Sequence, residues 1–297
     1  MLNAVNKPAV GVDIGVGTLR AVAIHSHGAR YRLVGAAETQ RAANHPVPTQ
    51  ADVERLIRAM QRQGIEMRSV TLAAPADQLS SAIVELPPRA SGAPVETLAK
   101  AELQKNTDGQ LEAYVWDLPQ SKYSKVSEYL AVGLSHSFAS ELIKPFESAG
   151  LSVVSIEPAS TALQRVTGAN NRLVFDVGRR GVRIYAFEGS STLFVRHYDI
   201  SNDAIDSDRI RASLTGSIDY LADRFPALEH ASVIVVGDPE LSERLSSMLR
   251  QEYETTVTNS MLLDLQGDSW LGELVQNARW AVAIGLAVRS PAVEVAA

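Results

Sequence analysis

The sequence contains no cysteine among its 297 residues, which excludes a disulfide framework and any metal site built on thiolates. No run reaches the roughly 18 uninterrupted apolar residues of a transmembrane helix, and the longest candidate, residues 280–288, is too short. The first eight residues lack the apolar core of a signal peptide. A net charge of −6 does not favour a nucleic-acid partner. We therefore expect a cytoplasmic protein that reaches a membrane only through a partner.

Several common catalytic patterns are also missing. There is no Walker A lysine, no G-x-S-x-G nucleophile elbow and no H-E-x-x-H zinc motif. His25 and His27 lie two apart and share one face of a strand, but no third ligand is near them in the sequence, so we do not expect a metal there.

The most informative stretch is residues 9–24, AVGVDIGVGTLRAVAI. It has two apolar runs of strand length, joined by a glycine-bearing turn at 15–18, and Asp13 lies inside the first run. A carboxylate in a buried strand is costly without a partner, and a glycine turn leaves backbone N–H groups open to an anion. The pattern indicates a carboxylate held near a phosphate through hydrated Mg²⁺. The alternative is an ordinary tight turn whose acid accepts backbone hydrogen bonds.

The same pattern returns in the second half. Residues 173–178, LVFDVG, match residues 10–15, VGVDIG, and an arginine follows the acid by seven positions in both copies, as Arg20 and Arg183. A second and a third apolar strand follow each copy. This is an internal duplication signal, and it favours a phosphate site over an isolated turn.

Periodicity indicates alternating strands and helices throughout the chain. Residues 90–135, with one helix and two strands, are predicted to form a small insert. We expect a first lobe at residues 1–168, which includes this insert, and a second lobe at 169–297. Only one long helix, residues 205–225, fits between the third strand of the second lobe and the next strand.

Five segments in chain order resemble the nucleotide-site segments of the actin-like ATPases. GVDIGVGTLRAVAI, VVSIEPASTALQRV, VFDVGRRGVRIYAF, VIVVGDPELSERL and WAVAIGLAV are similar to the segments called phosphate 1, connect 1, phosphate 2, adenosine and connect 2. The insert, the run AGLSVVSIEPASTAL and the ending ARWAVAIGLAVRS are most similar to the branch that contains PilM and FtsA. The resemblance implies an α/β fold with two duplicated, ribonuclease-H-like lobes, mixed sheets and a small inserted α+β subdomain.

The resemblance also implies a site for ATP with Mg²⁺. Asp13 and Asp176 would hold the metal through water. Glu157 would orient a water molecule, although a carboxylate near a helix N-terminus is also favourable on electrostatic grounds alone. The remaining nucleotide-binding positions would be Gly15, Gly17, Thr18, Gly178 and Gly237.

Three departures from the family pattern weaken this site. The second turn reads Arg179-Arg180-Gly181-Val182 where the family commonly has small and hydroxyl residues that end in threonine. The adenosine segment has Gly237-Asp238 in place of a Gly-Gly pair. The second lobe has room for one helix where the family fits two. We therefore expect weak ATP binding or none, with negligible hydrolysis, and a site without any cofactor stays open as an alternative.

By resemblance, the protein is a cytoplasmic scaffold at the inner-membrane platform of a type IV pilus or a related type II secretion machine. Its partner would be the N-terminal cytoplasmic peptide of a PilN-like membrane protein, bound in a groove of the first lobe beside the insert. Tyr114, Trp116 and Tyr123 are candidate contacts, or they pack within the insert. The alternatives are an active ATPase or small-molecule kinase of the actin and sugar-kinase superfamily, and a filament-forming relative.

Overall fold

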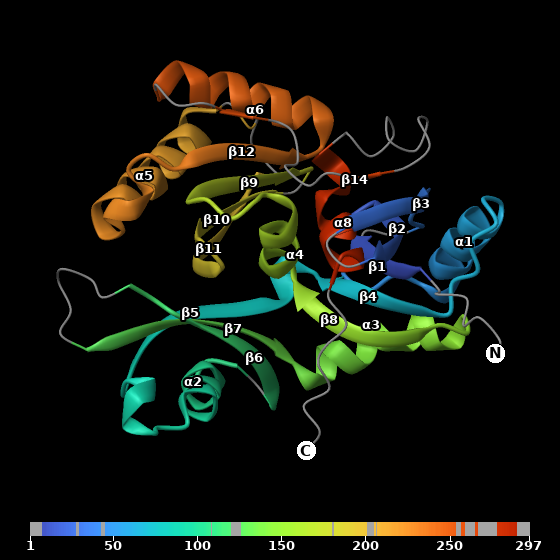
Figure 1. The fold of residues 1–297 in the computed structure, drawn as a ribbon, viewed down its shortest axis with the longest axis horizontal. Helices are drawn as coiled ribbons and strands as arrows, with labels where there is room; N and C mark the ends of the chain where they lie inside the picture. Colours follow the sequence, from blue (N-terminus) through green and yellow to red (C-terminus); the bar gives the residue numbers. More distant parts are fainter. Residues whose placement is uncertain are drawn as a thin grey trace. The chain divides into compact units, whose positions relative to one another are not determined.

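The computed structural model describes residues 8–27, 30–42, 45–107, 109–119, 126–179, 181–200, 205, 207–253, 257–258, 265–266 and 278–289. The chain packs into two compact units, which are described separately below (Figure 1). Unit 1 comprises Met1–Pro75, Glu141–Gly168 and Met261–Ala297, and unit 2 comprises Ala76–Ser140 and Ala169–Ser260. These units interleave along the chain, so they do not coincide with the lobes 1–168 and 169–297, which stay a prediction.

Unit 1 is built on a six-stranded sheet with the order β14-β3-β2-β1-β4-β8. The first three strands form the antiparallel meander expected from the sequence, and β4 and β8 continue the sheet in parallel. The strands are β1 (Ala9–Ile14), β2 (Thr18–His27), β3 (Arg30–Gln40), β4 (Ser69–Ala74), β8 (Ser152–Pro158) and β14 (Leu265–Gln266).

Helices cover both faces of this sheet. Helix α1 (Gln50–Gln61) packs on β2 and β3. It lies on the face to which Gly35 points, since a Cβ built on Gly35 would meet Ile65, just after the helix. Helices α4 (Ala159–Val166) and α8 (Ala281–Ala287) pack together, and α8 lies against β1 on the face to which Gly11 turns. Helix α3 (His136–Ser148) leads the chain into β8.

Helix α8 is the most tightly enclosed element of unit 1. All of its residues are buried, and it lies beside β1 although the two segments are near opposite ends of the chain (Figure 1). A Cβ built on Gly11 would lie 2.2 Å from the carbonyl oxygen of Ala283, and one built on Gly285 would lie 2.0 Å from that of Ala162. Two glycines therefore allow the backbones of β1, α8 and α4 to approach each other more closely than any other residue would permit.

Helix α1 begins with a capping box. The Thr49 hydroxyl accepts the amide of Asp52, and Asp52 Oδ2 accepts the Thr49 amide at 2.9 Å. The other oxygen of Asp52 accepts the amide of Ala42 at 3.0 Å, and the Arg55 guanidinium contacts the same oxygen. Burial alone would raise the pKa of Asp52, but the hydrogen bonds from Thr49 and Ala42 outweigh it, so the pKa is lowered.

We expect Asp52→Asn to lower the free energy of unfolding by about 1–2 kcal/mol at pH 7, because asparagine has one acceptor oxygen where Asp52 uses two and one buried amide loses its partner. Because the folded pKa is lowered, the charge of Asp52 stabilises the fold above the unfolded pKa of about 3.9, and this stabilisation disappears as pH falls through the folded pKa. Urea unfolding from pH 3 to pH 7 should show the wild-type and variant curves converging at low pH. A constant difference across that range would contradict the prediction.

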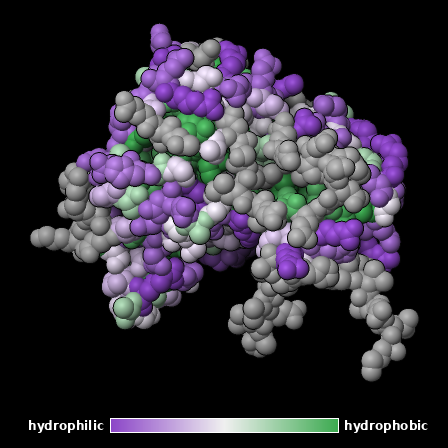
Figure 2. All heavy atoms as spheres, turned by 45° about the horizontal axis from the view of Figure 1, so that its top comes forward, coloured by the Kyte–Doolittle hydropathy of each residue, from purple (hydrophilic) through white to green (hydrophobic). Residues whose placement is uncertain are grey.

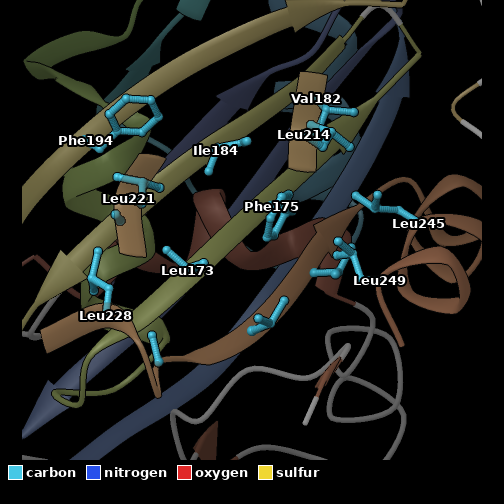
Figure 3. Packing of buried hydrophobic residues seen from close by; sticks show 14 of the residues in the cluster. Leu173, Phe175, Val182, Ile184, Phe194, Leu214, Leu221, Leu228, Leu245 and Leu249 are labelled. Atoms are coloured by element: carbon cyan, nitrogen blue, oxygen red, sulfur yellow. The ribbon is translucent and has the colours of Figure 1, made fainter. Parts of the chain in front are cut away.

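Unit 2 contains a five-stranded sheet with the order β11-β10-β9-β12-β13, and its first three strands repeat the antiparallel meander of unit 1. Figure 3 shows the core that forms where apolar residues of β9, β10 and β11 meet α5 and α6. The elements are β9 (Arg172–Gly178), β10 (Gly181–Glu188), β11 (Ser191–Asp199), α5 (Asp208–Arg224), β12 (Ser232–Gly237), α6 (Pro239–Glu252) and β13 (Val257–Thr258).

The predicted insert is a three-stranded sheet, β5-β7-β6, with helix α2 on one face. The prediction of a helix with two strands is incomplete, because β5 pairs with β7 along its whole length and the sheet begins at Leu79. Leu118, Leu130 and Val132 join the apolar core of β9–β11, so this sheet is anchored to the rest of unit 2. The elements are β5 (Leu79–Leu86), α2 (Val95–Gln104), β6 (Leu111–Asp117) and β7 (Ser127–Ser135).

Most of the expected elements are observed, including one long helix, α5, for the expected 205–225. The predicted last helix, 271–288, is seen as a 3₁₀ turn at Ala278–Trp280 followed by α8, and its first part, 271–277, lies outside the described residues. Within the described ranges, no helix is long and apolar enough to cross a bilayer. Hydrophilic residues cover most of the described part of the face in Figure 2.

Candidate functional site

The first glycine turn is a tight hairpin in unit 1. The Gly15 amide donates to the Thr18 carbonyl at 2.9 Å, and the Gly17 carbonyl accepts the amide of Arg41 at 2.9 Å. The Arg41 side chain also donates to the Gly15 carbonyl at 2.6 Å. A Cβ built on Gly17 would meet nothing within 4 Å, so the tip of the turn faces open space. Asp13, Gly15, Gly17 and Thr18 are thus brought together, as predicted from their order in the chain.

Asp13 belongs to a row of charges across the three strands of the meander. The register places Arg20 opposite Asp13 on one side and opposite Glu38 on the other. Arg20 Nη1 lies 3.3 Å from Asp13 Oδ2, and Arg20 Nε donates to Glu38 at 2.6 Å. Burial lowers the pKa of Arg20, but the charges of Asp13 and Glu38 outweigh it and the pKa is raised. Arg279, just before α8, approaches the other oxygen of Glu38 at 3.8 Å.

The second glycine turn, in unit 2, has the same length. Gly178 pairs with Gly181 across a two-residue turn, Arg179-Arg180, of which Arg180 lies outside the described residues. Arg179 is 89% exposed and lies 4.0 Å from a carboxylate oxygen of Asp238. Gly181 stands where the first turn has Thr18. A Cβ at Gly181 would lie 2.0 Å from the His197 ring and 2.7 Å from the Tyr198 carbonyl oxygen, so a side chain at this position has no room unless these neighbours shift.

Asp176 occupies the same position in the second meander as Asp13 in the first. Arg183 lies opposite Asp176 in the register and Nη1 of Arg183 is 2.8 Å from its carboxylate. The third position of this row is His197, opposite Arg183 on β11. Burial and, after it, the charge of Arg183 lower the pKa of His197, so this imidazole is neutral at physiological pH.

The Gly237-Asp238 pair serves to join β12 to α6. Gly237 has φ +108°, and a Cβ there would lie 2.1 Å from the Val177 carbonyl oxygen, so only glycine fits. Asp238 is the N-cap of α6, and its carboxylate accepts the amides of Glu240 and Leu241. The positive end of α6 is therefore already occupied by a carboxylate of the protein itself. Gly237 lies on the strand next to β9, where it pairs with Val177, the residue between Asp176 and Gly178.

Glu157 lies at the end of β8 in unit 1, and its side chain is only 2% exposed. Its Oε2 lies 2.8 Å from Arg165 Nη1 and its Oε1 lies 3.1 Å from Arg289 Nε, so each oxygen holds an arginine. The hydroxyl of Thr161 is 3.1 Å from Oε2 and that of Ser155 is 3.4 Å from Oε1. The water-orienting role of Glu157 stays a prediction, and these contacts favour a structural role that ties β8, α4 and the end of α8 together.

The aromatic residues of the insert were predicted either to contact a partner or to pack within the insert, and the described ones differ in this respect. Tyr114 is 39% exposed and stacks on Trp116 with ring centroids 5.8 Å apart. Trp116 itself packs partly buried against the core of unit 2. The third candidate, Tyr123, lies outside the described residues. Tyr114 is thus the described aromatic of this group that a partner could reach most readily.

The residues present do not fit the predicted metal well. Asp13 and Asp176 each pair with an arginine, and in the described part of the chain no group of three or more His, Asp or Glu side chains could hold a metal ion. The assignment of Mg²⁺ to Asp13 and Asp176 stays a prediction. The same holds for the nucleotide contacts of the glycine positions.

Comparison with solved structures identifies the fold. A structure of the PilM–PilN type IV pilus biogenesis complex matches with a TM-score of 0.73 at 16% identity, covering 96% of this chain and 100% of that one. A Bacteroides thetaiotaomicron protein described as having an actin-like ATPase fold matches with a TM-score of 0.50 at 12% identity, covering 87% of this chain and 94% of that one. The chain has the actin-like ATPase fold. The predicted fold class and the resemblance to PilM are confirmed.

A component of a secretion system also resembles this chain in structure. The cytoplasmic domain of EpsL, an inner-membrane component of the type II secretion system of Vibrio cholerae, matches with a TM-score of 0.50 at 11% identity. The match covers 90% of this chain and 92% of that domain. No protein-family model and no curated protein matches the sequence. At these identities the comparisons show the fold, and the function has to be argued from the residues.

Some of the residues at these positions were not found from the sequence. Glu38 and His197 are the third members of the two rows, and each is identified only by its pairing with an arginine on the neighbouring strand. Both strand pairs contain a register shift, so this pairing cannot be counted from the turn in the sequence. Arg289 reaches Glu157 from the far end of the chain, and no local pattern connects them. The paired arginines, Arg20 and Arg183, were visible as a repeated spacing, although their ion pairs were not.

Proposed function

We propose that this protein is a scaffold of the inner-membrane platform of a type IV pilus or a related secretion machine. It would work in the cytoplasm and bind a short N-terminal peptide of a PilN-like membrane protein. The observation that carries the proposal is the likeness to the PilM–PilN complex, which extends over nearly the whole of both chains. The likeness to the cytoplasmic domain of EpsL, a component of another secretion platform, supports the same class of role.

The local geometry supports a scaffold more than an ATPase. The N-terminus of α6 is capped by Asp238, which would repel a nucleotide, and the His197 ring lies where a side chain at Gly181 would begin. Glu157 is held by two arginines. Each of these positions lies in a segment that the resemblance assigns to the nucleotide site.

The insert offers features suited to peptide binding. The sheet order β5-β7-β6 leaves β5 and β6 as edge strands of that sheet, and an extended peptide can pair with such an edge. Tyr114 lies exposed on β6 and would supply an aromatic contact. We propose that the partner peptide uses this tyrosine.

Isothermal titration tests the proposal with two ligands. The first is a synthetic peptide of the short N-terminal cytoplasmic segment of a PilN-like membrane protein from the same organism, with a scrambled peptide as control. The second is ATP with Mg²⁺. We expect the peptide to bind with a dissociation constant in the micromolar range, as is common for such short segments, and ATP to give no measurable heat. Tight ATP binding without peptide binding would contradict the proposal.

A matched pair of variants locates the peptide. Tyr114→Ala should weaken peptide binding about tenfold or more, the effect of a moderate hot spot. Tyr220→Ala, which removes a tyrosine of similar exposure (43%) on α5, should leave the affinity unchanged. Equal effects of the two substitutions would remove Tyr114 from the proposed contact.

An active ATPase or small-molecule kinase is the second candidate, and the well-formed turn at Gly15–Thr18 favours it. It requires phosphate release that is lost in Asp13→Ala. A filament-forming relative would show an increase in light scattering with nucleotide.

A further inference from the structure

The two copies of the meander share a row of side chains whose middle member is an arginine. In unit 1 the row is Asp13, Arg20 and Glu38, and in unit 2 it is Asp176, Arg183 and His197. In both copies the guanidinium makes an ion pair with the aspartate next to the glycine turn, at 3.3 Å and 2.8 Å. The repetition of the same ion pair at the same register makes a chance surface contact a poor explanation.

Both aspartates need a positive neighbour. Their side chains are only 17% and 12% exposed, and a carboxylate held in a strand with so little water is unfavourable unless a cation compensates it. In each copy the arginine provides that charge from the adjacent strand, permanently, because arginine is not deprotonated in proteins.

The third residue of each row sets the net charge around the arginine. In unit 1 the guanidinium bridges two carboxylates, with Nη1 toward Asp13 and Nε toward Glu38. In unit 2 the third position is the neutral ring of His197, so Arg183 and Asp176 balance each other. A hydrated divalent cation beside either aspartate would be repelled by the arginine and would have to compete for the same oxygen.

We infer that Arg20 and Arg183 take the place of a divalent cation in the two copies, so that neither copy of the meander depends on Mg²⁺ or on a metal-bound nucleotide. This inference deepens the proposed function and rests on it, since a scaffold without a nucleotide still has to compensate the two inherited carboxylates. It differs from a merely weakened site in one respect. Removal of the arginine should create a response to divalent cations that the wild-type protein does not have.

Thermal unfolding of the full chain tests the inference, with EDTA compared with about 10 mM MgCl2 or MnCl2. We expect the wild-type melting temperature to change by less than about 1 °C, because a cation that does not bind the native state cannot stabilise it. Arg20→Gln should melt at a lower temperature in EDTA, and Mn²⁺ should raise it by about 2 °C or more. Electron paramagnetic resonance of Mn²⁺ should show at least tenfold tighter binding to this variant than to the wild type.

Two further variants keep the test decisive. Arg183→Gln asks the same question of the second copy, in case the first variant does not fold. Arg211→Gln is the control, since Arg211 pairs with Glu252 at 3.0 Å between helices α5 and α6 and belongs to neither row. Its melting temperature should respond to Mn²⁺ no more than that of the wild type.

The inference is overturned by either of two results. One is a wild-type melting temperature that Mg²⁺, alone or with ATP, raises by about 3 °C or more. The other is a folded Arg20→Gln or Arg183→Gln variant that responds to Mn²⁺ no more than Arg211→Gln. A wild-type response of that size overturns the inference even if neither variant folds. A failure of peptide binding would reject the proposed scaffold function and leave these measurements unaffected.

Discussion

Replacing Glu157 by alanine is expected to lower the free energy of unfolding by about 3–5 kcal/mol, the cost of removing one member of a buried ion pair. Its two oxygens hold Arg165 and Arg289, which are 28% and 27% exposed and have no other ion pair with a carboxylate among the described residues. Arg289 follows α8 directly, so its release would also loosen the attachment of that helix to β8. Equilibrium unfolding in urea, followed by circular dichroism, measures the effect.

Two controls separate the charge of Glu157 from its shape. Glu157→Gln keeps the size and can still accept from Thr161, but it removes the charge, so it should lose most of the same stability. Glu54→Ala removes a glutamate of the exposed pair Arg58–Glu54 on α1, and should cost no more than about 1 kcal/mol. If Glu157→Ala were as mild as Glu54→Ala, the two arginines would not depend on this carboxylate.

Replacing Gly285 by alanine is expected to cost about 3 kcal/mol or more, the upper end of what overpacking does in a core. The added Cβ would lie 2.0 Å from the carbonyl oxygen of Ala162 and 2.5 Å from its carbonyl carbon. Both atoms belong to the backbone of α4, so no side chain can move aside and the two helices must separate. The yield of folded protein and the urea midpoint measure the effect.

Helix α5 offers the matched control. Gly216 is also a helical glycine, but a Cβ there would meet nothing within 4 Å. Gly216→Ala should therefore raise the free energy of unfolding by about 0.5–1 kcal/mol, because alanine loses less backbone entropy in a helix. The same substitution is thus expected to lower the free energy of unfolding at Gly285 and to raise it at Gly216. A loss of stability at Gly216 similar to that at Gly285 would show that close packing is not the cause.

Much of the fold could be predicted from local patterns. The two meanders, α1 with Gly64 after it, and the single helix α5 follow from alternation, helical periodicity and turn residues. The sheet to which β5 belongs could not be predicted, because an edge strand is defined by its partner, and β7 begins some forty residues later. For the same reason, no local sequence pattern predicts that residues 76–140 pack with unit 2.

The candidate site was predictable in its positions and less so in its chemistry. The repeated D-x-G pattern located both turns and both aspartates, and the structure brings each set together within its own unit. The partners of those groups depend on strand register and on contacts between distant segments, as Arg289 and His197 show. A carboxylate in a motif indicates that a positive charge must lie near it. Whether that charge is a metal ion or an arginine depends on residues that are distant in the sequence.

The position of α8 has a consequence for the order in which the chain can fold. Its close contact with β1 through Gly11 joins the last described helix to the first strand, so the N-terminal meander is synthesised long before the helix that covers this face. At about 5–20 residues per second, translation leaves that face without α8 for many seconds. Unit 1 therefore completes its core late. By then the described strands of unit 2, which lie between β1 and α8 in the sequence, have already been synthesised. The last described helix thus covers a sheet whose first three strands lie at the start of the chain.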